Sequence, residues 1–239
     1  MKLIFSFLFS AIVSLAVGQG KGSLIGAWES KGPEQNQTKV ITYVPGFFSV
    51  AIYNFADKKF IGTYGGKLVI ANGELTETIE YDTQKPENVG QSRKVNFKRD
   101  KKELTLTGAT EGKFTQLDDG TPGKLMGAWL ITGRYRDNEI RRSTPGARRT
   151  MKILSGTRFQ WIAYNVETKE FFGTGGGTYT TVNGKYTENI DFFSRDETRV
   201  GASLTFDFSL PEGEWRHQGK SSKGDPLDEI WTQREKIGI

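Results

Sequence analysis

The sequence predicts an all-β protein made of two tandem small antiparallel up-and-down β-barrels, with about eight strands in each. The second half of the 239-residue chain repeats the first. Each half contains short aromatic and β-branched runs separated by turn residues, as in 47–55 and 159–166. A helical period is only weakly present, near 225–236. Short strands in meander order close into a barrel that leaves no exposed edge, and a two-sheet sandwich is the alternative.

Composition excludes several classes of protein. The chain is 36% hydrophobic, 12% aromatic and 26% charged, which excludes a disordered or collagen-like chain. It contains no Cys, so disulfide scaffolds, thiolate metal sites and cysteine nucleophiles are excluded. A single His disfavours a poly-His metal site and a Ser-His-Asp hydrolase. We therefore expect neither a metal nor a cofactor.

The N-terminus has the pattern of an export signal. A positive start at Lys2 precedes an apolar run over residues 3–17 that ends in small residues. This run is shorter than the ~20 residues that span a bilayer. We interpret residues 1–18 as a signal peptide cleaved near Gly18/Gln19, with a retained anchor as the alternative. Export without Cys suits a bacterial periplasm or exterior, so we expect a secreted or periplasmic protein with no membrane span in its mature form.

Two offsets define the repeat. The segment 24–28 recurs 101 residues later, as Leu-Met-Gly-Ala-Trp in place of Leu-Ile-Gly-Ala-Trp. The window 53–90 aligns without a gap 111 residues later, with 15 identities. The second copy therefore carries ten extra residues before Tyr164. We place the first domain at residues 24–119, the linker at 120–123 and the second domain at 124–236.

Glycine marks turns and bends within each copy. Asn72-Gly73 and Asn183-Gly184 lie between alternating runs, and Asn-Gly favours the type I′ hairpin turn. Clustered glycines precede each of these turns, and we interpret them as barrel corners rather than a phosphate loop, because no Lys-Ser/Thr pair and helix follow. They are Gly62, Gly65 and Gly66 in the first copy and Gly173, Gly175, Gly176 and Gly177 in the second.

A Gly-Ala-Trp motif opens each copy, at Gly26 to Trp28 and at Gly127 to Trp129. With the β-meander that follows, it resembles the lipocalin or calycin group, and most closely the small lipocalin-like domains of secreted bacterial proteins. The resemblance implies structural roles for Gly26, Trp28, Gly127 and Trp129, with each Trp across a closed barrel bottom and ligands entering an open mouth. The Thr-Asp-Tyr element of lipocalins is missing, and Arg234 is the one C-terminal Arg placed to stack on Trp129. Ligand identity does not carry over.

Each copy places a Glu on an apolar strand face. Alternation puts Glu77 beside Leu75 and Ile79, and Glu188 beside Tyr186 and Ile190. A carboxylate there is costly unless it is paired or hydrogen-bonded. One interpretation is an inward carboxylate that orients a ligand in the cavity. The other, favoured by its presence in both copies, is a structural carboxylate bonded to a Trp, Tyr or Arg.

The strand 158–164 has one mixed face, formed by Arg158, Gln160, Ile162 and Tyr164. If this face points inward, these residues line a polar mouth of the second barrel and bind a ligand. If it points outward, they are solvated side chains.

The second copy is also more basic. Residues 24–123 have no net charge and two Arg, whereas the chain from Lys124 onward has a net charge of +3 and eleven Arg. The segment 134–149 overlaps the insertion, and as a long polar loop at a barrel mouth it suits an anionic polysaccharide, lipid or carboxylate. A solvated loop is the alternative. Export and the neutral first unit disfavour nucleic acid. The candidate ligand-binding residues of this segment are Arg141, Arg142, Arg148 and Arg149.

These features predict a secreted, non-enzymatic binding protein for a small hydrophobic or anionic molecule. A surface adaptor with filled barrels is the first alternative. A carbohydrate- or lipid-acting enzyme that uses Glu188 with Asp191 or His217 is the second, but Asp191 lies on the opposite face of its strand, so no carboxylate pair forms there. Some calycin-like barrels bind haem, which suggests a ligand role for His217, although a lone His is usually a surface or hydrogen-bonded residue.

Overall fold

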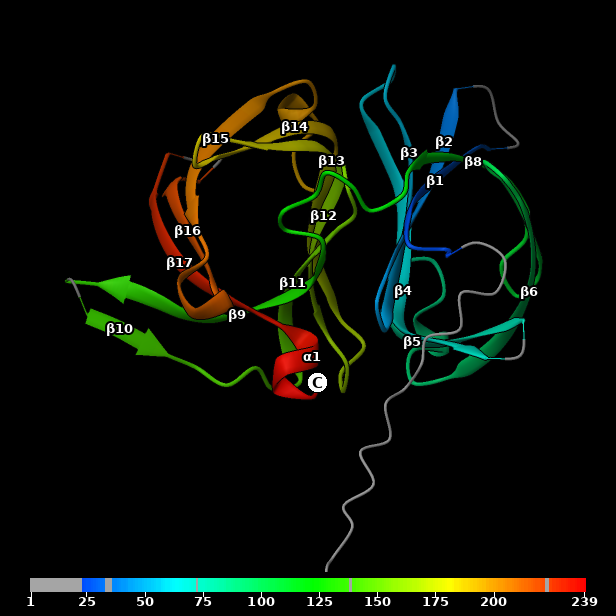
Figure 1. Cartoon of the computed structure of the whole chain (residues 1–239), viewed down its shortest axis with the longest axis horizontal. Helices are drawn as coiled ribbons and strands as arrows, with labels where there is room; N and C mark the ends of the chain where they lie inside the picture. Colours follow the sequence, from blue (N-terminus) through cyan, green and yellow to red (C-terminus); the bar gives the residue numbers. More distant parts are fainter. Residues whose placement is uncertain (1–22, 33–35, 72, 138, 222–223) are drawn as a thin grey trace, which may run out of the picture.

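The computed structural model describes residues 23–32, 36–71, 73–137, 139–221 and 224–239. It contains two closed antiparallel β-barrels side by side, and the second continues in a hairpin beyond its wall (Figure 1). The prediction of an all-β double barrel is confirmed. The signal peptide predicted over residues 1–18 lies outside the described residues. Within them, no helix is long and apolar enough to cross a membrane.

The first barrel is an uninterrupted meander in which each strand pairs with the next and the last closes on the first. The short helix η1 (Pro86–Asn88) precedes its sixth strand. Its strands are β1 (Gly26–Lys31), β2 (Gln37–Val44), β3 (Phe47–Asn54), β4 (Lys59–Ala71), β5 (Glu74–Asp82), β6 (Ser92–Asp100), β7 (Glu103–Gly108) and β8 (Gly112–Asp118).

The second barrel has the same meander with one strand added outside the closed wall. The added strand, β10 (Glu139–Arg142), pairs with the far end of the first strand of this barrel, so part of the insertion expected as a loop is a β-hairpin. The barrel strands are β9 (Gly127–Arg136), β11 (Arg148–Leu154), β12 (Arg158–Asn165), β13 (Phe171–Val182), β14 (Lys185–Phe193), β15 (Ser203–Ser209), β16 (Trp215–Lys220) and β17 (Pro226–Gln233). The helices are η2 (Glu197–Arg199), η3 (Pro211–Gly213) and α1 (Arg234–Ile237).

The Gly-x-Trp motif performs the same structural task in both barrels. The indole N–H of Trp28 donates to the carbonyl of Leu24, and that of Trp129 to the carbonyl of Leu125, each at 2.9 Å. Gly26 has a φ of +123°, and a Cβ there would lie 2.1 Å from the carbonyl oxygen of Asp118. In the first barrel the motif therefore needs Gly for a close backbone approach, and in both barrels its Trp is buried in the core.

Glycines mark the strongest irregularities of the walls. The pairing of β4 with β5 shifts register between Gly65 and Gly66, and that of β13 with β14 shifts between Gly176 and Gly177. A Cβ on Gly66 or Gly177 would lie 2.0 Å from a carbonyl oxygen of the neighbouring strand. These positions are bulges that bend the strand, and a side chain would force the two strands apart.

Equivalent faces of the two barrels pack against each other around an approximate two-fold axis. Ser49 donates a hydrogen bond to Gln160, its counterpart 111 residues later. The rings of Phe60 and Phe171, also counterparts, stack with centroids 6.2 Å apart. The ring pairs Tyr53–Phe192 and Tyr81–Tyr164 exchange roles between the copies, and both have centroids 4.9 Å apart. The two copies thus meet as the halves of an isologous dimer meet.

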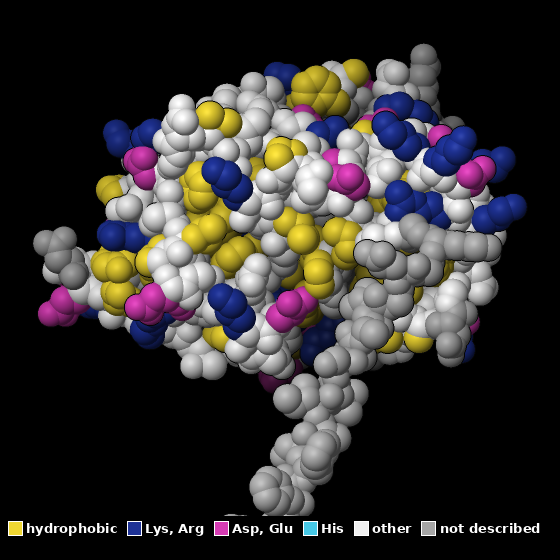
Figure 2. Space-filling view, in the orientation of Figure 1, with side chains coloured by type: hydrophobic (Ala, Val, Ile, Leu, Met, Phe, Trp, Pro, Cys, Tyr) yellow, Lys and Arg dark blue, Asp and Glu magenta, His cyan; other side chains and the backbone are white. Residues whose placement is uncertain are grey.

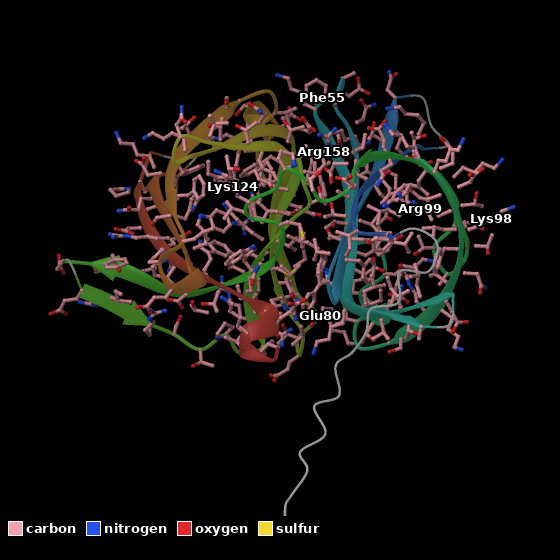
Figure 3. The ribbon with its side chains drawn as sticks, viewed as in Figure 1. Phe55, Glu80, Lys98, Arg99, Lys124 and Arg158 are labelled. Carbon is pink, nitrogen blue, oxygen red and sulfur yellow. The ribbon has the colours of Figure 1, made fainter. Side chains whose placement is uncertain are left out.

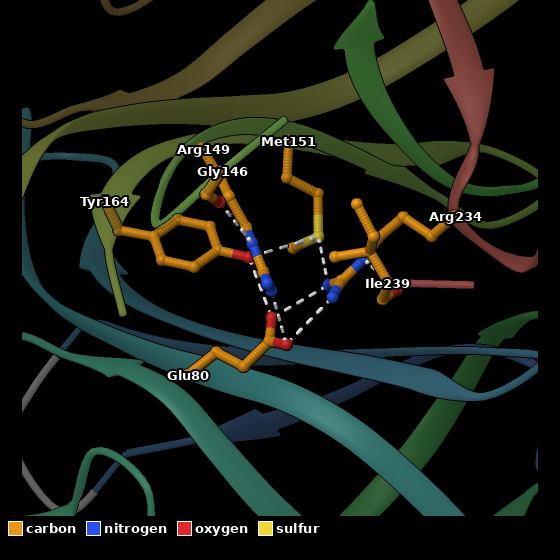
Figure 4. A network of polar contacts seen from close by, with 7 residues as sticks. All are labelled: Glu80, Gly146, Arg149, Met151, Tyr164, Arg234 and Ile239. Atoms are coloured by element: carbon orange, nitrogen blue, oxygen red, sulfur yellow. Dashed lines mark hydrogen bonds and ion pairs between the residues drawn. The ribbon is translucent and has the colours of Figure 1, made fainter. Parts of the chain in front are cut away.

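A buried ion network lies at this junction (Figure 4). Glu80 of the first barrel accepts two hydrogen bonds from the guanidinium of Arg234 and one from Arg149, each at 2.8 Å. The Tyr164 hydroxyl donates a fourth, also at 2.8 Å. Burial by itself would raise the pKa of the Glu80 carboxyl, but Arg234 and Arg149 hold it below its usual range. Arg234, expected over Trp129, instead pairs with Glu80 and lies over the ring of Phe47 in the first barrel.

We expect Glu80→Gln to lower the free energy of unfolding by about 3–5 kcal/mol, because it leaves the fully buried Arg234 without its counter-charge. Urea unfolding of the full chain measures the change. Glu74→Gln, which removes the exposed pair of Glu74 with Lys94, is the control and should move the midpoint little. Equal effects of the two substitutions would contradict a stabilising role for the network.

Candidate functional site

The second barrel contains a cavity of about 180 Å³. Its wall is mainly apolar and aromatic, and it includes five ionisable side chains. On the face shown in Figure 2, hydrophobic side chains gather near the middle of the second barrel, while Lys and Arg lie mostly toward the periphery. The apolar lining includes Ile131, Trp161, Ile190, Leu204, Leu227 and Trp231, and the ionisable lining consists of Arg134, Lys152, Glu188, His217 and Glu229.

Glu188 lies in the cavity wall, on the face that strand alternation assigns to it. Its carboxylate accepts hydrogen bonds from Lys152 Nζ and from the Tyr186 hydroxyl, each at 2.8 Å. Lys152 is only 5% exposed, and its ammonium lies 4.9 Å from the ring centroids of both Tyr186 and Trp215. Glu188 therefore has the structural partner that burial requires and still faces the cavity.

The equivalent carboxylate of the first barrel has a different cation. Glu77 accepts from Arg93 at 2.9 Å and from the Thr110 hydroxyl at 3.1 Å. Burial raises the pKa of Glu77, and Arg93 opposes that rise. Its second carboxylate oxygen is buried and has no hydrogen-bond partner among the described residues.

The exchange of cations leaves space in the second barrel. Arg93 lies opposite Glu77 in the β5–β6 ladder, and the residue opposite Glu188 in the β14–β15 ladder is Leu204. The cation comes instead from β11, where Lys152 occupies the position of Ile41 in the first barrel. The 111-residue offset, applied to Arg93 and Ile41, gives Leu204 and Lys152, and this is the sequence signal that would have revealed the exchange.

His217 is the least satisfied polar group of the cavity. It is 2% exposed, and neither ring nitrogen has a hydrogen-bond partner among the described residues. Its Nδ1 lies 3.6 Å from a Glu229 carboxylate oxygen that already accepts from the Trp231 indole at 3.2 Å. Burial, and then the charge of Lys152, lower the pKa of His217, so the ring is neutral near pH 7. The cavity is too small to enclose a haem.

The predicted basic residues separate into three groups. Arg148 lines a groove of about 370 Å³ beside the cavity and stacks on Phe172, with its guanidinium 4.5 Å from the ring centroid. Arg149 also lines this groove but directs its guanidinium to Glu80. Arg141 is exposed on β10, and Arg142 forms a bidentate pair with Glu214 at 2.7 and 2.8 Å.

The mixed face of β12 points out of its barrel but is not solvated. Gln160 and Tyr164 are buried against the first barrel, where Gln160 donates to the Thr63 hydroxyl at 2.8 Å. Arg158 lines a cleft of only about 10 Å³ between the barrels. Figure 3 shows Arg158 and Glu80 toward opposite ends of this junction. These candidate residues therefore lie at the interface rather than in the cavity, a placement that strand alternation alone does not distinguish from solvent exposure.

The remaining candidates do not form a metal or two-carboxylate site on one strand. The described part of the chain has no group of three His, Asp or Glu side chains that could hold a metal ion. Asp191 faces the junction with the first barrel. Burial is the main cause that raises the pKa of Tyr53 there, and the charge of Asp191 is the second. Glu229, which the sequence did not single out, is the second carboxylate that lines the cavity.

The chain matches no model of a known protein family and no curated protein.

We expect the pKa of His217 to lie below 6.5, because burial and Lys152 disfavour its protonated form. The unfolded chain then takes up the proton at higher pH than the folded protein, so the free energy of unfolding should fall as the pH drops through about 6.5. NMR titration of the imidazole measures the pKa, since this is the only His of the chain. In His217→Gln the free energy of unfolding should depend less on pH between about pH 6 and 7, the range around the ordinary His pKa. A folded-state pKa at or above 6.5 would contradict the assignment.

Proposed function

We propose that this protein is an exported, non-enzymatic, lipocalin-like binding protein that holds a compact, mainly hydrophobic molecule in its second barrel. The observation that carries the proposal is the cavity of about 180 Å³ in that barrel. It is bounded by aromatic and aliphatic side chains, and a few polar groups converge on it. Such a combination is typical of small-molecule sites.

The volume supports a ligand with a single ring or a short chain. An apolar cavity of about 150 Å³ is sufficient to hold benzene. Trp161 and Trp231 offer flat apolar walls, and Ile131 and Leu204 supply aliphatic contacts. Burial of such a body would provide most of the affinity.

The polar groups support a hydrogen-bonding group on the inner end of the ligand. A neutral imidazole offers one donor and one acceptor, and the His217 ring has neither engaged with another described residue. Leaving such a group unpaired costs about 1–3 kcal/mol, and a ligand hydroxyl would recover this cost. Lys152 and Glu188 satisfy each other and provide a fixed polar surface beside it.

A structural role for the first barrel is supported by its interior. Arg93 occupies the region that Leu204 leaves open in the second barrel, and it reaches inward to Glu77. The interior also contains a cluster of buried side chains that includes Trp28, Ile41 and Phe114. We infer that the first barrel has a structural role and holds the second in place. This inference keeps part of the adaptor interpretation, in which the barrels are filled.

Calorimetric titration with p-cresol tests the proposal. We expect p-cresol to bind wild-type protein and Leu204→Arg to weaken binding by at least about tenfold, because the Arg would fill the cavity and compete for Glu188. Leu210→Arg is the control, since Leu210 is 40% exposed on the surface. Unchanged binding in Leu204→Arg, or no binding by the wild type, would contradict the proposed site.

A further inference from the structure

The hairpin of β9 and β10 carries Arg134 and Arg141, and we call it the Arg-bearing hairpin. It is the largest departure of the second copy from the first, and it adjoins the cavity. In the β9–β17 ladder, Ile131 pairs with Trp231 and Gly133 with Ile230, so Thr132 has no opposite residue. This bulge changes the alternation of β9 and places Arg134 opposite Glu229, on the cavity side. The strand then leaves the barrel wall as half of the hairpin (Figure 1).

Strand β10 places a second cation beside this one. Arg141 lies directly opposite Arg134 in the β9–β10 ladder, an arrangement in which like charges repel. Arg134 is 56% exposed at its side chain, and its ion pair is a 3.4 Å contact with Glu229. Among the described residues Arg141 has no ion-pair partner. One carboxylate, Glu229, thus faces two guanidinium groups, and their combined charge is only partly balanced.

The groove beneath the hairpin continues outward from the cavity. Cavity and groove share Ile131, Arg134 and Thr150 as lining residues. The groove also exposes the hydroxyl-bearing Ser143 and Thr144, and no carboxylate lines it. A molecule seated in the cavity would therefore extend into a polar region of positive charge.

We propose that Arg134 and Arg141 form a binding site for an anionic oxygen group, a carboxylate in the simplest case, on the outer end of the ligand. This assignment rests on the proposed function and specifies its ligand class as an acid with a hydrophobic body. Guanidinium groups suit this role because they present planar, paired donors to a carboxylate. Among the described residues the first barrel has no strand equivalent to β10, and its Arg93 reaches inward to Glu77.

The test compares three probes that share a phenol ring: p-cresol, 4-hydroxyphenylacetate and the neutral 4-hydroxyphenylacetamide. We expect the acid to bind wild-type protein about tenfold more tightly than the amide at low salt, with the difference reduced at high salt. The double variant Arg134→Gln/Arg141→Gln should abolish that difference, and it should weaken p-cresol less than it weakens the acid. Lys98→Gln/Lys113→Gln is the charge-matched control, since both residues are exposed on the first barrel, and Figure 3 shows Lys98 on the side away from the second.

The outcomes separate the two proposals. If p-cresol binds but the acid and the amide bind equally, the anion site is wrong and the cavity assignment stands. Equal loss of all three probes in the Arg variant would overturn the anion site as well, since it would show general damage to the barrel mouth. If the Lys control also lost the difference in affinity between the acid and the amide, the overall charge of the protein would explain that difference, and the local anion site would be wrong. If none of the probes binds the wild type, the proposed function fails and the anion site with it.

Discussion

A carboxylate buried inside a β-barrel requires a cation, and the strand that supplies this cation decides how much of the interior stays open. In the first barrel Arg93 reaches Glu77 from the adjacent β6 and occupies the interior. In the second, Lys152 reaches Glu188 from β11, and the short Leu204 stands where the Arg would be. The same requirement for charge balance is thus met by an inward-reaching Arg in the first barrel and by a Lys beside a cavity in the second.

The junction constrains the molecule in a comparable way. Glu80 is buried between the barrels, and its charge is balanced only when Arg149 and Arg234 of the second barrel meet it. Asp118, at the end of β8, adds a second anchor by accepting from the backbone N–H groups of Gly156 and Thr157 at 2.9 Å. Both anchors require specific partners on the other barrel, so buried polar contacts specify how the two units pack together.

The two copies show how a duplicated unit can divide its tasks. The faces that pack together retain equivalent residues, such as Phe60 and Phe171, and a two-fold arrangement follows from that equivalence. The departures from the repeat collect in the second unit: the exchanged cation, the Arg-bearing hairpin, and His217, whose ring has no hydrogen-bond partner among the described residues. All three border one cavity, which is why we assign the proposed binding activity to that unit.

The duplication, the β-meander and the cavity-facing side of Glu188 could be predicted from residue order, because alternation, turn chemistry and an internal repeat are patterns within the sequence. The pairing of Lys152 with Glu188, and the burial of Gln160 against the other barrel, could be seen only in the folded molecule. Alternation states which face a side chain occupies, but barrel closure and docking decide what lies against that face. Contacts between strands distant in sequence therefore determine which candidate residues line the cavity and which lie at the interface between the barrels.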